Sequence, residues 1–80
     1  MTKYNGHKNW NHWNVALWIN NDQKLYEMAR DCVMHARNVK ASKKIAALMM
    51  LNRLEDQGIT RTADGAPYSV SSILAAMVGM

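Results

Sequence analysis

The chain has 80 residues, 49% of them hydrophobic and 20% charged, which are the proportions of a folded protein with room for one core. This composition excludes an intrinsically disordered chain and a second domain. No apolar run is long enough to cross a membrane, and residues 1–6 contain no hydrophobic signal-peptide region, so we expect a cytoplasmic protein. The net charge is +4, and the single cysteine, Cys32, cannot form an internal disulfide, which fits a reducing compartment.

The first expected helix contains all three tryptophans of a chain that has no phenylalanine. Asn9 is a typical N-cap residue, which predicts a helix over about residues 10–20. Trp10, Trp13 and Leu17 fall on one face of this helix. Because a single indole can bury about 200 Å² or more, we expect this face to form a large part of the core.

Two longer helices are expected in the middle of the chain. Asp22 predicts the start of a helix over about residues 23–38, and Ser42 the start of another over about residues 43–57, which Gly58 ends. In the former, apolar residues recur at three- and four-residue spacing and indicate a buried face: Leu25, Met28, Ala29, Cys32, Val33 and Ala36. In the latter, the expected face is wider: Ile45, Leu48, Met49, Leu51, Asn52 and Leu54.

The last part of the chain predicts a loop and a short helix. The loop contains a turn at Asp64-Gly65, and two short strands beside this turn are the alternative to an irregular loop. Ser69 caps a helix over about residues 70–78, with these residues turned inward: Val70, Ile73, Leu74 and Met77. The expected fold is therefore mainly α, a single small four-helix domain over residues 1–80 in which residues 1–8 are a loosely held lead-in.

Positive charge is concentrated at the junction between the two middle helices. No acidic residue lies between Asp31 and Glu55, whereas four cations bracket the junction: Arg37, Lys40, Lys43 and Lys44. Such a patch suits a polyanion, either nucleic acid or the acidic face of a protein. The alternative is a solvated helix end whose cations interact with the last helical carbonyls.

Several side chains fall off the expected buried faces and are candidates for a protein interface. Seven methionines are many for this length, and methionine suits both irregular cores and adaptable binding surfaces. Tryptophan is enriched in binding hot spots, and the last helix presents a small, nearly uncharged face. The candidate interface residues are Trp18, Met34, Met50, Ser71, Ser72 and Ala75. The alternative is that the tryptophans and methionines only fill the core.

The sequence offers little for catalysis or for binding a metal or cofactor. A zinc site needs three or four converging ligands, whereas the chain has one cysteine and three scattered histidines. Cys32 lies on an expected buried face, where a thiol is normally inert. The six carboxylates all fit helix ends or turns, and the four glycines are isolated, so there is no phosphate-binding loop. We therefore expect no enzymatic activity, no metal and no cofactor.

The run from Tyr4 to Ile19 has an order of residues that composition alone does not explain: Tyr-Asn-Gly-His-Lys-Asn-Trp-Asn-His-Trp-Asn-Val-Ala-Leu-Trp-Ile. It resembles the N-terminal signature Tyr-Asn-Gly-Trp-Thr-Asn-Tyr-x-Thr-Trp-Asn-Val-x-Leu-Trp of small, mostly uncharacterised proteins of phages and mobile elements. It departs at His7, where that family often has tryptophan, and at His12, where it often has threonine. The resemblance covers about the first quarter of the chain and implies a phage accessory protein without catalytic activity.

A second pattern occupies residues 51–77: Leu51, Leu54, Gly58-Ile59, Thr62, Gly65, Tyr68 and Ser69-Val70-Ser71-Ser72-Ile73. It resembles the helix-turn-helix segment of large serine recombinases, which implies that residues 43–78 are helix-turn-helix-like. In that family the last helix enters DNA, typically with arginine or lysine after the serine-rich pair. Here Leu74, Ala75 and Ala76 stand at those positions, which puts base and phosphate contacts in doubt.

Two functions are compatible with these features. The first is a phage-type accessory protein that inhibits a bacterial defence complex, of the anti-CRISPR or anti-restriction type, by non-catalytic binding in the host cytoplasm. This hypothesis is an analogy of genomic setting. The alternative is a small helix-turn-helix DNA-binding regulatory or accessory protein, which the basic junction supports and the uncharged last helix opposes. In both cases we expect a monomer or homodimer with no membrane partner.

Overall fold

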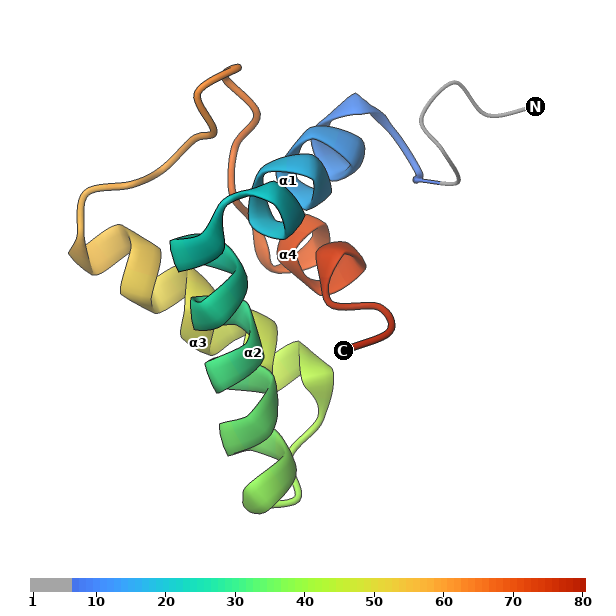
Figure 1. Cartoon of the computed structure of the whole chain (residues 1–80), viewed down its shortest axis with the longest axis vertical. Coiled ribbons are helices and arrows are strands. Elements are labelled where there is room, and N and C mark those ends of the chain that lie inside the picture. Colours follow the sequence, from blue (N-terminus) through green and yellow to red (C-terminus); the bar gives the residue numbers. More distant parts are fainter. Residues whose placement is uncertain (1–6) are drawn as a thin grey trace.

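The computed structural model describes residues 7–80; residues 1–6, which include the first part of the N-terminal signature, lie outside the described part. Its four helices are α1 (Trp10–Asn21), α2 (Gln23–Asn38), α3 (Lys43–Asp56) and α4 (Val70–Ala76) (Figure 1). α2 and α3 form an antiparallel pair joined by a short turn, and α4 packs against both α1 and α3. The expected mainly α, four-helix fold is confirmed.

Side-chain hydrogen bonds start three of the helices at the residues that the sequence predicts. Asn9 Oδ1 and Asp22 Oδ1 each accept a hydrogen bond from the amide three residues later, at 3.0 and 3.1 Å. Ser69 and Ser72 form a reciprocal capping box at the start of α4. Ser42 is the N-cap residue of α3, but its side chain makes no capping hydrogen bond.

The ends of α3 and α4 differ in how well the sequence predicts them. Gly58 has a φ of +75°, and the Ile59 amide donates to the Leu54 carbonyl at 2.9 Å, which closes the last turn of α3. This is the left-handed end expected for glycine. α4 ends at Ala76, with Met77 as its C-cap, and is therefore shorter than the helix expected to reach residue 78.

α2 buries the face that its periodicity predicts. Ala29, Cys32, Val33 and Ala36 are buried, and Leu25 packs against them from the edge of the core. The other side of α2 is mostly charged or polar, so only one orientation removes its apolar residues from water. The pattern in the sequence was therefore sufficient for this helix.

The expected burial of the tryptophan face of α1 is wrong for Trp10 and Leu17, and Trp13 is only half-buried. Trp10 and Leu17 are 38% and 39% exposed, whereas Val15 and Ile19, on the opposite side of the helix, are fully buried. α1 carries apolar side chains on both sides, so periodicity could not select one. Packing selects the side with the smaller side chains, because these let the axis of α4 approach closely, whereas indoles hold two helices apart.

α3 shows the same shift, and it overturns the expected exposure of Met50. Ile45 and Leu48 are each 44% exposed, whereas Met50 is fully buried together with Leu54. Two adjacent alanines, Ala46 and Ala47, form the close contact with the rest of the core. Met50 extends from this alanine face and fills the remaining volume, which suits its flexible side chain. It is a core residue and is not available to a partner.

The connection between α3 and α4, residues 57–69, is held against α1 by side-chain hydrogen bonds. Asn14 Nδ2 donates to Asp64 Oδ2 at 2.9 Å, and Thr62 Oγ1 donates to Asn14 Oδ1 at 2.6 Å. The Trp18 indole N–H also donates to Asp64 Oδ2, at 3.0 Å. We call these four residues the α1 junction. Asn14 and Thr62 are buried, so the junction satisfies polar groups that would otherwise destabilise the fold.

The described part of the connection contains no strand. Arg61 and Pro67 form one isolated antiparallel bridge where two short strands were the alternative. The connection is much longer than the turn of about three or four residues that joins the helices of a helix-turn-helix motif. The helix-turn-helix interpretation of residues 43–78 stays a prediction.

Candidate functional site

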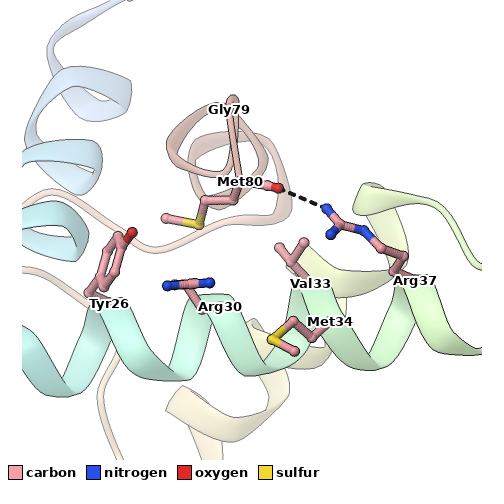
Figure 2. A pocket seen from close by; sticks show the side chains of 7 residues that line it. All are labelled: Tyr26, Arg30, Val33, Met34, Arg37, Gly79 and Met80. Carbon is pink, nitrogen blue, oxygen red and sulfur yellow. Dashed lines mark hydrogen bonds between the residues drawn. The ribbon is translucent and has the colours of Figure 1, made fainter.

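A groove of about 310 Å³ lies between α2 and the last residues of the chain (Figure 2). Five of its side chains come from α2, at a spacing that places them along one side of the helix. Two further residues come from the C-terminal segment. The lining residues are Tyr26, Arg30, Val33, Met34, Arg37, Gly79 and Met80.

The C-terminal segment is folded back onto α2 by a glycine and an arginine. Gly79 has a φ of +89°, a left-handed conformation that turns the chain after α4. Arg37 Nη2 then donates to the Met80 carbonyl oxygen at 3.0 Å. Figure 2 shows the Met80 side chain extending from this contact along the groove toward Tyr26. One wall of the groove is therefore built from residues far from α2 in the sequence.

The groove combines an apolar floor with two guanidinium groups. Val33 is buried beneath it, while Met34 is 51% exposed at its edge. The Arg30 guanidinium carbon lies 6.0 Å from the centre of the Tyr26 ring, at the outer limit of a cation–π contact. Arg37, two helical turns from Arg30, flanks the other end. Arginine, tyrosine and methionine are the side chains that protein interfaces favour.

The predicted basic patch continues from this groove onto the turn between α2 and α3, at the bottom of Figure 1. Arg37, Lys40, Lys43 and Lys44 are all exposed there. The alternative interpretation expected cations such as Arg37 to bind the last carbonyls of the helix. Arg37 instead donates a guanidinium hydrogen bond to the Met80 carbonyl oxygen. We call residues 37–44 the basic tip.

Three cations of the basic tip occupy positions where the backbone conformation or the helix dipole disfavours lysine. Lys40 has a φ of +59°, and the amide of Ala41 donates to the Ala36 carbonyl at 2.7 Å. This is a helix end at which glycine is the favoured residue. Lys43 and Lys44 occupy the first turn of α3, where the helix dipole favours anions over cations. A residue that occupies a backbone conformation or helix position disfavoured for its type is a candidate for function.

The structure buries one of the three α4 residues that the sequence predicts for an interface. Ser72 is 1% exposed because it completes the capping box, so its expected exposure is wrong. Ser71 is exposed, with its Oγ 2.9 Å from His12 Nε2, and Ala75 is half-buried. Trp18 is half-buried, and its indole N–H is engaged by Asp64. Met34 is the predicted interface residue that the structure places at the groove.

Sequence reasoning missed Tyr26, Arg30 and Met80 as members of this groove. Tyr26, Arg30 and Met34 recur every four residues along the exposed side of α2 next to its buried face, so their spacing could have linked them. Met80 could not have been found in this way. Its place beside α2 depends on the turn at Gly79 and on the packing of α4.

The described residues do not assemble a recognisable catalytic or metal centre. Within residues 7–80, no group of three or more histidine, cysteine or acidic side chains could hold a metal ion. Cys32 is buried, and desolvation raises the pKa of its thiol, which favours the unreactive form. Desolvation, with a smaller contribution from Lys8, lowers the pKa of His12. Among these residues, no second side chain hydrogen-bonds to the His12 imidazole to complete a triad with Ser71.

Comparison with known proteins supplies a family but no activity. The model of DUF7249, a family of unknown function, matches residues 1–80. No curated protein matches the chain, and no solved structure does. Within the described part of the chain, no helix is both long and apolar enough to span a membrane.

Proposed function

Because the chain belongs to DUF7249, a family of unknown function, we propose its function from its surface: it is a non-catalytic, protein-binding accessory protein of the phage type. It inhibits a bacterial defence complex, of the anti-CRISPR or anti-restriction type, in the cytoplasm of the host. The observation that carries the proposal is the groove on α2, where Tyr26 and Met34 lie beside Arg30 and Arg37.

The chemistry of the groove supports a protein partner. Tyrosine and arginine dominate binding hot spots, and methionine adapts its shape to an incoming surface. Further exposed apolar side chains lie on the neighbouring helices: Trp10 and Leu17 on α1, and Ile45 on α3. A standard interface covers about 800 Å² of each partner, so contact has to extend beyond the groove.

The defence complex as target rests on the resemblance of the N-terminal run to phage and mobile-element proteins. Part of that signature has a structural role here, since Asn14 and Trp18 hold the α3–α4 connection and Val15 is buried. Leu17, which matches the signature, is 39% exposed, and Trp10, which stands where the signature has tyrosine, is 38% exposed. These two positions support the view that the signature also serves a binding surface.

A second function, nucleic-acid binding, is favoured by the basic tip. Lys40, Lys43 and Lys44 are kept against the local preferences of the backbone and the helix dipole. In α4, by contrast, Ser72 is buried and no residue is basic, so the helix that would read bases offers little to them. Any contact would therefore be with phosphates and independent of sequence.

The two functions are separated by capture from a nuclease-treated bacterial lysate, with wild type and two variants. Met34→Glu places a charge at the edge of the groove, and we expect it to abolish retention of a specific protein. The matched control is Leu48→Glu, which adds the same charge at a similarly exposed site on α3. Both variants should unfold within about 0.5 kcal/mol of wild type, as surface substitutions usually do.

A different result would assign the function to the basic tip. If the protein instead binds generic DNA with an affinity that falls steeply with salt, the basic tip carries the function. Neutralising Arg37, Lys40, Lys43 and Lys44 to glutamine would then abolish binding, while Met34→Glu would leave it unchanged. That pattern would make the chain a nucleic-acid-binding protein.

A further inference from the structure

The groove on α2 has a charge pattern that restricts which protein segment it can accept. Tyr26 and Arg37 stand at its two ends, with Arg30 and Val33 between them and the Met80 side chain across from Arg30 (Figure 2). Glu27 and Asp31 line the neighbouring surface of α2, beyond Tyr26 and Met34. Arg30 borders both surfaces, Arg37 lies on the side of α2 that faces the C-terminal residues, and Lys24 lies outside the groove near the start of the helix.

We propose that this groove binds an extended acidic segment of the partner protein, in which two carboxylates flank an apolar side chain. The proposal rests on the protein-binding function above and names the partner chemistry for the same site. The carboxylates pair with Arg30 and Arg37, and the apolar side chain packs on Val33 and Met80. Guanidinium groups are suited to carboxylates because two parallel N–H groups can bind both oxygens.

The spacing of the two arginines determines the spacing of the acids. Seven residues along a helix correspond to about 10 Å, because the rise is about 1.5 Å per residue. An extended peptide advances about 3.3 Å per residue and its side chains alternate between two sides, so carboxylates that share a side with the residue midway between them are four residues apart and span about 13 Å. An Asp-x-Leu-x-Asp segment therefore presents both aspartates to the long Arg30 and Arg37 side chains and its leucine to the apolar floor.

Nucleic acid fits this groove less well than an acidic peptide. Phosphates of a single strand repeat without apolar groups between them, so Val33 and Met80 would lose water without gaining an apolar contact. The acidic flank formed by Glu27 and Asp31 would also repel a continuous polyanion that crosses α2. A peptide can place acids on one side only, which is what this surface requires.

The test uses a short Gly/Ser peptide, acetylated and amidated, with Asp-Ser-Leu-Ser-Asp at its centre. Amide NMR shifts of the full chain during titration should concentrate on α2 between Tyr26 and Arg37 and on Gly79 and Met80. Replacing both acids by asparagine should weaken binding at least about tenfold, which is the scale of one charge-assisted contact. Replacing the leucine by serine should also weaken binding.

Variants of the protein show which arginines are responsible. Arg30→Gln and Arg37→Gln should each weaken peptide binding about tenfold. Lys24→Gln, which removes the same charge from an exposed position on α2 outside the groove, should not. Since Arg37→Gln also removes the contact to Met80, Arg30→Glu gives an independent test: it should prefer a peptide with lysine in place of one of the two aspartates, the other aspartate still pairing with Arg37.

Several outcomes would overturn the proposal. These are shifts confined to the basic tip, equal binding of the asparagine peptide, or tighter binding of oligothymidylate to the same groove. If the peptide fails while capture from lysate is still lost in Met34→Glu, the acidic ligand is wrong and the protein-binding function stands. If the peptide binds as expected while capture is unaffected by Met34→Glu, the ligand chemistry stands and the proposed function is wrong.

Discussion

The α1 junction and the groove on α2 both place polar side chains beside apolar ones, but they use their polar groups in opposite ways. In the junction, Asn14 donates to Asp64 and accepts from Thr62, so the side chains serve one another within the chain. In the groove, one N–H of Arg37 reaches the Met80 carbonyl, and Arg30 has no hydrogen-bond partner among the described residues. Polar groups satisfied internally support folding, whereas those facing an open groove are available for binding.

The largest effect should come from breaking the junction. Asn14→Ala removes the hydrogen bonds of the Asn14 side chain to Asp64 and Thr62. The buried Thr62 hydroxyl then lacks the acceptor for its proton, so we expect a loss of about 2–3 kcal/mol in the free energy of unfolding. Urea unfolding followed by circular dichroism measures this. Asn11→Ala, at an exposed position of the same helix, is the matched control, since it makes the same change in helix propensity. Equal stability of the two variants would show that the junction is not structural.

A smaller effect of opposite sign is expected at the basic tip. Lys40→Gly relieves the left-handed conformation and should stabilise the fold by about 0.5–1 kcal/mol, while removing one cation from the tip. Lys40→Ala removes the same charge but keeps Cβ, so it should not gain this stability. Thermal unfolding of the two variants compares them directly. If glycine gives no gain over alanine, the tip is not strained, and that argument for its function is lost.

The smallest effect concerns the pH dependence of the junction. Hydrogen bonds from Asn14 and then from Trp18 lower the pKa of Asp64. The carboxylate therefore contributes stability that is complete above the unfolded pKa of about 3.9 and is lost as the pH falls through the folded value. In urea melts across this acidic window, the stability difference between wild type and Asp64→Asn should shrink as the pH falls. A constant difference would mean that the charge of Asp64 plays no part.

The helices and their starts were predictable because their causes are local. Asn9, Asp22 and Ser69 each accept a hydrogen bond from the amide three residues later. Gly58 adopts a left-handed backbone conformation, which is easier for glycine than for other residues. The buried face of α2 was predictable for a related reason. Its apolar residues lie on one side only, so burial of that side is the only arrangement that removes them from water.

The candidate site was only partly predictable. Met34 and the four cations of the basic tip were identified from the sequence, since each falls outside an apolar face and no acidic residue interrupts the cations. The other candidates had intramolecular roles that the sequence did not reveal. Met50 fills the core, Ser72 completes a cap, and the indole N–H of Trp18 binds Asp64. A side chain off the main apolar face can still be used within the fold.

What the sequence by itself determined was the set of helices, because caps, helix-ending glycine and apolar periodicity act within a few residues of one another. What only the tertiary structure decided was the orientation of α1 and α3, and with it the exposure of Trp10 and Leu17. Both helices are apolar on more than one side. The choice between sides depends on how closely small residues let a neighbouring helix approach, and that neighbour is distant in the sequence. The groove was decided in the same way, because α4 carries Met80 to α2.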